Sequence, residues 1–265
     1  MTHLAKFDKV RESLRGKKVL VAFSGGVDSS VMALLAREVA EEVVLLTVNT
    51  ATFTGPELNH AKRVADELGL KQILVSYDWV ADKELAANTR ERCYVCKKKL
   101  AQLWLSEAEK RGFQVVVEGT TASDLEDFRP GKRALRELKI SSPLLEEGIT
   151  KEEVRVFAAE KHLSVAERPS MACLATRFPY DMEITNDMLD MVLRTEIYVR
   201  EKFGVETVRA RYHDELVRIE VGYDEREKLF NTDKLDDLQE FAKDVGFSYV
   251  TLDVKGYRMG AMDET

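Results

Sequence analysis

The stretch SGGVDSS, residues 24–30, decides the fold because it joins a buried strand pattern to a helical one. The run before it, residues 17–23, is short, apolar and rich in Val, which is typical of a strand buried on both faces. Residues 29–40 have the apolar spacing of a helix. In such a turn the backbone N–H groups and the helix N-terminus converge on one point. The stretch therefore predicts an anion site, and phosphate is its natural ligand.

The residue types in this loop suit a nucleoside triphosphate. Glycines allow close approach of the main chain, serines add hydroxyl donors, and Asp28 can hold Mg²⁺ against the phosphates. An ordinary turn capped by Ser and Asp would explain any one of these residues but not all seven. The loop is neither a Walker A sequence nor a GxGxxG fingerprint. The candidate nucleotide ligands in it are Ser24, Gly25, Gly26, Asp28, Ser29 and Ser30.

Strand and helix patterns alternate after this loop, which predicts an α/β fold with a parallel sheet flanked by helices. We expect strands at 43–48, 72–75 and 115–117, helices at 56–68, 95–111 and 134–138, and a helix that Thr150 and Glu153 begin with a capping box. Polar residues follow the second and fourth strands, at the edge where α/β sheets keep their sites. These add Asn49, Gly119, Thr120 and Asp124 to the candidate nucleotide ligands.

An irregular stretch from Ser164 to Thr185 holds two of the five prolines, and we predict the domain junction there. The expected division is a first domain over residues 1–178 and a smaller α+β domain for substrate binding or oligomerisation over residues 179–265. In the second domain we expect a helix at 186–203, strands at 207–212 and 216–221, helices up to residue 245 and a last strand at 248–254.

The bulk composition is that of a globular protein. Of its 265 residues 45% are hydrophobic and 33% are charged. No stretch approaches the roughly 20 apolar residues that span a bilayer, and the start has no apolar signal core, so we expect a cytoplasmic protein without membrane contact. The net charge of -7 argues against a nucleic-acid partner, because proteins that bind nucleic acid usually carry a basic face.

Five segments of the chain resemble known enzymes. SGGVDSS resembles the PP-loop signature of enzymes that cleave ATP between the α and β phosphates. Four later segments resemble, in order, the landmarks of the LarE-type sulfur transferases: EGTTASDLEDFRPG (118–131), SPL (142–144), RPSMACLATRFPY (168–180) with MEIT (182–185), and VRARYH (208–213). The resemblance covers most of the chain. It implies an adenine nucleotide alpha hydrolase-like PP-loop domain followed by a small C-terminal domain.

The resemblance also implies a reaction. ATP and Mg²⁺ adenylylate a carboxylate on a pyridinium mononucleotide with release of pyrophosphate, and sulfur is then inserted to make a thiocarboxylate for the nickel-pincer cofactor of lactate racemase. Cys173 matches the cysteine that attacks the acyl adenylate and gives up its own sulfur in the best-known members. The family's common EGTNADD differs here at Thr121 and Ser123, which leaves Asp124 and Asp127 as the acidic groups.

Three cysteines are present, and an odd number without an export signal argues against a disulfide framework. Cys93 and Cys96 form a C-x-x-C pair among basic residues that favour thiolate. With Cys173 they would fill three corners of a [4Fe-4S] cluster and leave one iron free to bind sulfide. A subset of PP-loop sulfur transferases with three cysteines works in this way. A sacrificial Cys173, a redox-active pair, zinc and inert buried thiols are the alternatives.

Basic residues of the second half suit a phosphate on the substrate. Arg209 and Arg211 alternate along a predicted strand and project from one face, and Arg177 lies in the junction stretch. Guanidinium groups capture phosphate in a bidentate way. For Arg218 we expect a solvent-facing position instead. Glu196 resembles an acidic residue near the family's substrate pocket, although an acid on a charged helix is more often solvated.

The expected partners are a small nucleotide-like substrate, sulfide or another sulfur donor, and further copies of the chain in a homo-oligomer. Two other functions compete with this one. A PP-loop tRNA thiolase or amide-forming ligase is disfavoured because no RNA-binding module or glutaminase-sized segment is evident. A non-catalytic ATP-binding module is disfavoured because the PP-loop is accompanied by an acidic loop, a combination that suits turnover.

Overall fold

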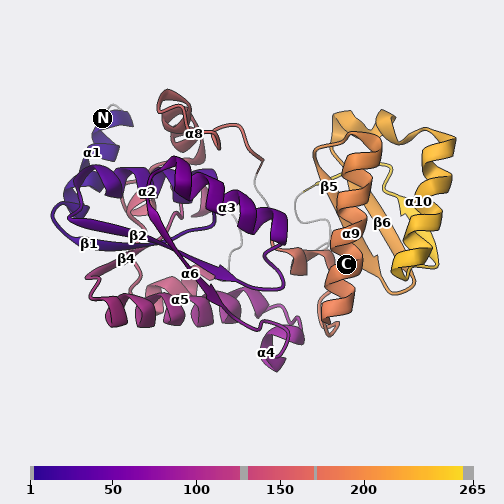
Figure 1. The fold of residues 1–265 in the computed structure, drawn as a ribbon, viewed down its shortest axis with the longest axis horizontal. Coiled ribbons are helices and arrows are strands. Elements are labelled where there is room, and N and C mark those ends of the chain that lie inside the picture. Colours follow the sequence, from indigo (N-terminus) through magenta and orange to yellow (C-terminus); the bar gives the residue numbers. More distant parts are fainter. Residues whose placement is uncertain (1–2, 126–130, 170–171, 259–265) are drawn as a thin grey trace. The chain divides into compact units, whose positions relative to one another are not determined.

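The computed structural model describes residues 3–125, 131–169 and 172–258 (Figure 1). The chain forms two compact units, one of residues 1–77 and 91–171 and one of residues 78–90 and 172–265. Residues 78–90 thus belong to the second unit, although the predicted division into residues 1–178 and 179–265 assigns them to the first domain. That division stays a prediction.

The first unit contains a four-stranded parallel sheet, as the alternating pattern predicts. Its strands are β1 (Lys18–Ala22), β2 (Glu42–Asn49), β3 (Lys71–Ser76) and β4 (Val115–Val117), in the order β3-β2-β1-β4. The central strand β1 pairs with β2 on one side and with β4 on the other, so that Val19 lies beside Val43 and Val115. The expected α/β fold class is confirmed, and the carboxyl ends of β1, β2 and β4 meet at one edge.

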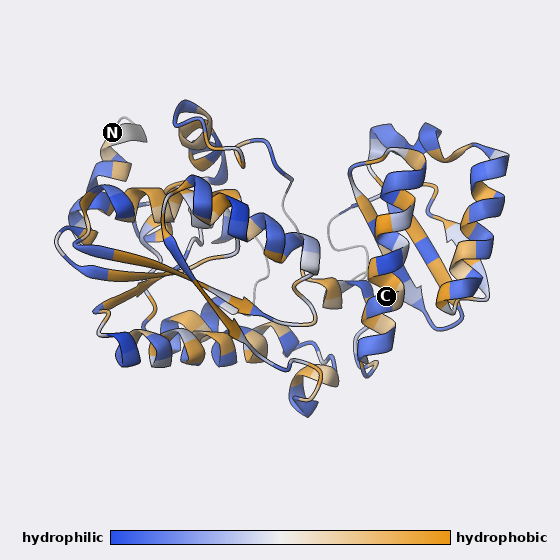
Figure 2. Cartoon of the chain, in the orientation of Figure 1, coloured by the Kyte–Doolittle hydropathy of each residue, from blue (hydrophilic) through white to orange (hydrophobic). Residues whose placement is uncertain are grey.

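Helices cover both faces of this sheet (Figures 1 and 2). On one face α1 (His3–Leu14), α2 (Val27–Val39), α3 (Gly55–Glu67) and α8 (Lys151–Glu160) pack on the side chains of Val19 and Val21. On the other face α5 (Arg92–Arg111) and α6 (Gly131–Glu137) pack on Leu20 and Ala22. The Val-rich run is buried on both sides because its side chains alternate between two hydrophobic cores. The short helices η1 (Ala122–Leu125) and α7 (Pro143–Glu146) follow β4 and α6.

The second unit has a three-stranded mixed sheet. Strand β5 (Val208–His213) runs antiparallel to β6 (Leu216–Val221), which pairs in parallel with β7 (Tyr249–Leu252). The helical elements of this unit are α4 (Lys83–Ala86), η2 (Leu174–Arg177), α9 (Asn186–Phe203), η3 (Tyr223–Leu229) and α10 (Thr232–Val245).

Residues 78–90 are tied to the second unit by backbone and side-chain hydrogen bonds. The Asn88 amide donates to the Pro179 carbonyl at 2.6 Å, and Ile184 N donates to the Ala86 carbonyl at 2.8 Å. Trp79 and Leu85 are buried. The segment is therefore an integral part of this unit's structure.

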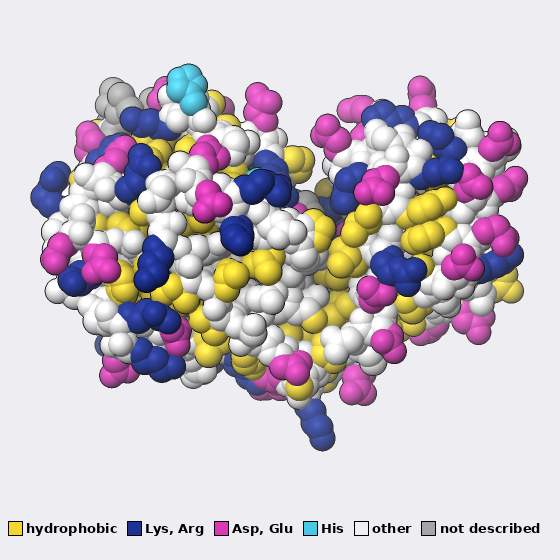
Figure 3. Space-filling view, viewed as in Figure 1, with side chains coloured by type: hydrophobic (Ala, Val, Ile, Leu, Met, Phe, Trp, Pro, Cys, Tyr) yellow, Lys and Arg dark blue, Asp and Glu magenta, His cyan; other side chains and the backbone are white. Residues whose placement is uncertain are grey.

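In the described part of the chain, no helix is both long and apolar enough to span a bilayer. Lys, Arg, Asp and Glu side chains are interspersed over the visible face of each unit (Figure 3). This mixture agrees with the balance of charges in the sequence.

Candidate active site

The PP-loop turns sharply between β1 and α2. Gly25 has φ 74°, and a Cβ atom built there would lie 2.6 Å from the Cα atom of Ala61 in α3. Only glycine fits this conformation and this contact. Gly26 is the extended residue before α2, and no side chain caps the helix there. The N-terminus of α2 therefore offers its N–H groups to an anion.

The serines of the loop hold its shape. The hydroxyls of Ser29 and Ser30 donate to the Gly26 carbonyl at 3.0 and 2.9 Å. Ser24 Oγ accepts from Gly26 N at 3.3 Å and lies 3.2 Å from Ser29 Oγ. These bonds draw the hydroxyls of the predicted nucleotide ligands into one small cluster beside the helix N-terminus.

The loop after β4 packs directly on the first turn of α2. A Cβ atom at Gly119 would lie 2.8 Å from the backbone nitrogen of Ser29, so only glycine fits there as well. The buried carboxylate of Glu118 accepts from Thr120 N at 3.1 Å, from Thr120 Oγ1 at 2.7 Å and from Ser142 Oγ at 2.5 Å. Glu118 thus fixes the position of two predicted ligands, Gly119 and Thr120. The sequence analysis did not select Glu118, although an acidic residue directly after the all-Val strand Val115–Val117 could have indicated a functional position.

Two carboxylates lie near each other at this edge. Asp124 is buried, and one of its oxygens accepts from Thr121 N at 2.8 Å and from Thr121 Oγ1 at 3.0 Å. Burial raises the pKa of Asp28, and the negative charge of Asp124 raises it further, while Lys151 and Arg155 oppose the shift. Lys151, which sequence reasoning missed, forms an ion pair with Asp28. Asp127 lies outside the described residues.

Asn49 ends strand β2 at the same edge of the sheet. Its side chain is half-buried, and its carbonyl accepts from Tyr77 N at 2.9 Å. The parallel register brings the ends of β1, β2 and β4 together, so the structure gathers all the predicted nucleotide ligands at the edge where α/β sheets bind ligands.

The three cysteines are not joined in disulfide bonds, and they are divided between the two units. Cys93 and Cys96 lie one turn apart at the start of α5, the first exposed and the second half-buried. Arg92 approaches the Cys93 sulfur at 3.8 Å. Cys173 is exposed and belongs to the second unit, where it precedes η2. Among the described residues no three His, Cys, Asp or Glu side chains are grouped to hold a metal ion.

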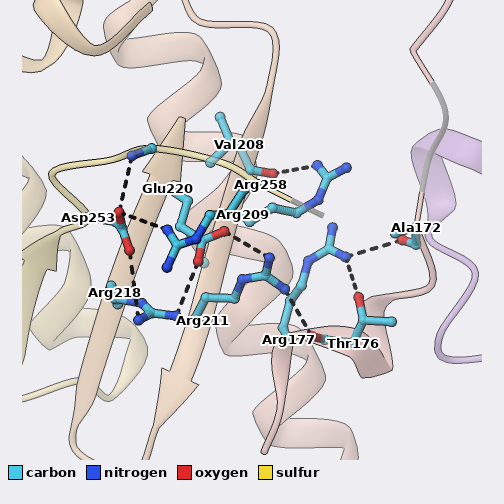
Figure 4. A network of polar contacts seen from close by, with 12 residues as sticks. Ala172, Thr176, Arg177, Val208, Arg209, Arg211, Arg218, Glu220, Asp253 and Arg258 are labelled. Atoms are coloured by element: carbon cyan, nitrogen blue, oxygen red, sulfur yellow. Dashed lines mark hydrogen bonds and ion pairs between the residues drawn. The ribbon is translucent and has the colours of Figure 1, made fainter. Parts of the chain in front are cut away.

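The predicted phosphate ligand Arg177 is buried in the second unit, where it donates to the Ala172 carbonyl and to Thr176 Oγ1 (Figure 4). It is also paired with an acid. Its guanidinium donates to both carboxylate oxygens of Glu196, at 2.7 and 3.2 Å. Glu196 also accepts from Ala210 N at 3.0 Å and is only 3% exposed. The interpretation of Glu196 as solvated is therefore wrong, because this side chain links α9 to β5 and η2.

Arg211 and Arg218 share one acid. The buried carboxylate of Glu220 accepts from Arg211 at 2.8 Å and from Arg218 at 3.2 Å. Arg211 also donates to the Thr176 carbonyl at 3.0 Å, and Arg218 lies 3.8 Å from Asp253. Arg218 was expected to face solvent, and its side chain is 27% exposed, but it also belongs to this polar network.

Arg209 differs from these arginines. It is 3% exposed, and its guanidinium donates to the Val208 carbonyl at 2.7 Å and lies over the Tyr257 ring at 4.8 Å. Burial lowers the pKa of Arg209, and the nearby charge of Arg177 lowers it further. Within the described ranges its Nε atom has no hydrogen-bond partner and the side chain has no ion pair. A buried cation without a paired anion is a candidate for binding an anionic ligand.

Comparison with known proteins identifies the family of this chain. The asparagine synthase family matches residues 8–161, which is more than half of the chain. The chain is 36% identical to an uncharacterised protein of Synechocystis sp., over 93% of this chain and 92% of that protein. It is 32% identical to the pyridinium-3,5-bisthiocarboxylic acid mononucleotide synthase of Lactiplantibacillus plantarum, over 94% of this chain and 90% of that enzyme.

A match to another PP-loop enzyme covers less of the chain. A tRNA-specific 2-thiouridylase of Desulfitobacterium hafniense is 29% identical over only 44% of this chain and 37% of that enzyme. The nearly full-length match to the mononucleotide synthase is thus far more extensive. The chain belongs to the PP-loop ATP-pyrophosphatase superfamily and, within it, to the LarE-type ATP-dependent sulfur transferases, enzymes that adenylylate their substrate.

Proposed function

We propose that this enzyme adenylylates a carboxylate of a pyridinium mononucleotide and then converts it into a thiocarboxylate, as a step in making the nickel-pincer cofactor. The observation that carries this substrate class is the buried, unpaired guanidinium of Arg209, which suits the phosphate of a mononucleotide. The activity of the relative from Lactiplantibacillus plantarum, a pyridinium-3,5-bisthiocarboxylic acid mononucleotide synthase, supports the same class.

The first half-reaction uses the PP-loop residues. A carboxylate oxygen of the substrate attacks the α-phosphorus of ATP, and the bond from that phosphorus to the bridging oxygen breaks. Its electron pair leaves with pyrophosphate. The N–H groups at the start of α2 hold the phosphates, as the bare N-terminus allows.

Asp28 and Asp124 would hold the Mg²⁺ ion that accompanies ATP. Oδ1 of Asp28 is buried and has no partner among the described residues, which suits a metal ligand. When bound, the ion supplies positive charge against the phosphates.

The phosphate of the substrate is assigned to the arginines of the second unit. Arg209 is its principal ligand because, among the described residues, its Nε atom has no hydrogen-bond partner and its charge has no ion pair. Arg177 and Arg211 complete the site while Glu196 and Glu220 hold them in place. This gives the second unit a role in substrate binding, and we also propose that it mediates assembly of the homo-oligomer.

We expect Arg209→Ala to lower kcat/KM for the pyridinium mononucleotide by about 10- to 100-fold, the equivalent of one charged hydrogen bond. The corresponding riboside, which lacks the phosphate, should be used equally well by both proteins. Substrate-dependent release of pyrophosphate measures each value, and Arg194→Ala, an exposed arginine of α9, is the matched control. Equal losses for the mononucleotide and the riboside would contradict the assignment of Arg209. No substrate-dependent release by the wild type would contradict the substrate class itself.

For the sulfur we propose a [4Fe-4S] cluster ligated by Cys93, Cys96 and Cys173. The exposed or half-buried thiols suit metal ligation, and Cys93 and Cys96 lie on one face of α5 because they are three residues apart. A bound cluster with one open iron supplies a sulfide that can be renewed from solution. The alternative is that Cys173 gives up its own sulfur in a single turnover.

A further inference from the structure

Residues 253–258 follow β7 and are fastened to the end of β6. The Asp253 side chain accepts from Gly256 N at 3.1 Å and so holds the turn between them. Gly256 has φ 74°, and a Cβ atom built there would lie 2.6 Å from the Val221 carbonyl oxygen, so only glycine fits. Tyr257 N then donates to the same carbonyl at 2.7 Å. The backbone of Tyr257 is therefore fixed against β6.

This attachment places the Tyr257 ring beside the guanidinium of Arg209. In the β5–β6 ladder Val221 is paired with Val208, the residue that precedes Arg209. The guanidinium carbon of Arg209 lies 4.8 Å from the centroid of the Tyr257 ring, within the range of a cation–π interaction. Arg209 is buried, and such an interaction is stronger when the cation is withdrawn from water.

Arg177 and Arg211 show a different way to hold a buried arginine. Each is paired with a buried carboxylate, Glu196 and Glu220 respectively. A carboxylate neutralises the guanidinium, whereas an aromatic face offsets part of the cost of burying the cation and carries no net charge. Within the described ranges Arg209 has no ion pair and its Nε atom has no hydrogen-bond partner. The tyrosine therefore holds this cation while its charge stays available to a ligand.

We infer that Tyr257 is a positioning residue for binding of the substrate phosphate. Its ring holds the guanidinium of Arg209 in the orientation in which the arginine meets the phosphate, and it does so without a competing negative charge. Tyr257 acts through Arg209, by contact alone, and its hydroxyl group is not needed for this effect. The inference rests on the phosphate site of the proposed function and adds the residue that prepares its principal ligand.

The test compares Tyr257→Leu, which removes the ring, with Tyr257→Phe, which keeps it. We expect Tyr257→Leu to raise KM for the pyridinium mononucleotide about 3- to 10-fold with little change in kcat, which is the size of a desolvated cation–π contact. The riboside, which lacks the phosphate, should be used as by the wild type. Tyr257→Phe should restore most of the loss. Tyr249→Leu, which removes an exposed tyrosine of β7, is the matched control.

A double variant separates an effect through Arg209 from a general one. In the Arg209→Ala background, Tyr257→Leu should cause no further loss, because the ring no longer has a guanidinium to hold. Losses that multiply in the double variant would overturn the inference. Equal losses for mononucleotide and riboside together with a lower Tm would overturn it too, since Tyr257 would then only support the fold. Should Tyr257→Leu fail to fold, Tyr257→Met carries the same test.

A titration with inorganic phosphate tests the inference without any turnover. The Nε–H signal of Arg209 in NMR spectra, assigned by its absence in Arg209→Ala, should respond to phosphate at the same concentrations in the wild type and in Tyr257→Phe. Tyr257→Leu should need about 3- to 10-fold more phosphate. An unchanged titration in Tyr257→Leu would overturn the inference. A wrong substrate class is seen separately, as a wild type that releases no pyrophosphate with the mononucleotide.

Discussion

Replacement of Asp28 by Ala is expected to abolish pyrophosphate release, with a loss of about 10³-fold or more. Asp28 and Asp124 are the carboxylates at the PP-loop edge, and loss of a metal bridge to the phosphates costs several kcal/mol in the transition state. The fold should survive. Burial raises the pKa of Asp28, so its charged form is disfavoured in the folded protein and does not contribute to stability at neutral pH.

Pyrophosphate release and Tm are measured together on this variant. Asp66→Ala, which removes an exposed carboxylate of α3, is the matched control and should behave as the wild type. Near-normal release by Asp28→Ala would remove Asp28 from the mechanism. A collapse of Tm would show instead that the Lys151 ion pair supports the fold.

The second large effect concerns sulfur transfer. We expect Cys173→Ala to abolish thiocarboxylate formation while pyrophosphate release continues, because activation and sulfur insertion are separate steps. Under the cluster proposal Cys93→Ala and Cys96→Ala also lose transfer, and each variant loses iron. Anaerobically prepared wild type should then be brown, contain about four irons per chain and turn over repeatedly with sulfide.

A sacrificial Cys173 gives a different set of results. The protein would be colourless, would transfer one sulfur per chain and would emerge lighter by one hydrogen sulfide, since the cysteine becomes dehydroalanine. Cys93→Ala and Cys96→Ala would then transfer sulfur normally. Intact-protein mass after the reaction, together with iron analysis, therefore decides between the two, and a clean loss from Cys173 without bound iron would defeat the cluster proposal.

The sequence was sufficient to predict the elements whose signals are local. Helix α9 was expected at 186–203 and spans Asn186–Phe203, because the Thr185 side chain caps its start and Gly204 in the left-handed conformation ends it. The Val-rich strands and the PP-loop were predictable for the same reason, since short apolar runs and glycines at fixed places are visible in the sequence.

What could not be predicted depends on contacts between distant residues. No local pattern predicts that residues 78–90 belong to the second unit. They are joined to it by hydrogen bonds of Asn88 with Pro179 and of Ala86 with Ile184, which are far away in the sequence. Charged residues were misjudged in the same way. For Glu196 and Arg218 exposure was the expected alternative, because single charges usually lie at the surface. Glu196 is instead paired with Arg177 of η2, and Arg218 contacts Glu220 of its own strand and Asp253 beyond β7.

In the candidate active site, too, residues with local motifs were predicted and residues placed by long-range packing were not. The candidate ligands in the PP-loop and after β4 were predicted from their motifs, whereas Glu118 and Lys151 were not. Lys151 lies within the capping box of Thr150 and Glu153, a pattern that indicates only the start of a helix. Its proximity to Asp28 arises only when α8 packs beside α2. Residues that act through such packing are found in a structure and not in a motif.

The central claim is that ATP is cleaved between the α and β phosphates to activate a substrate carboxylate for sulfur insertion. Mass spectrometry of a single reaction with ATP, the pyridinium carboxylate mononucleotide and a sulfur source tests it directly. We predict one AMP and one pyrophosphate for each thiocarboxylate, and an acyl adenylate that accumulates in Cys173→Ala. Formation of ADP and phosphate, or of AMP without any dependence on the carboxylate substrate, would contradict the account.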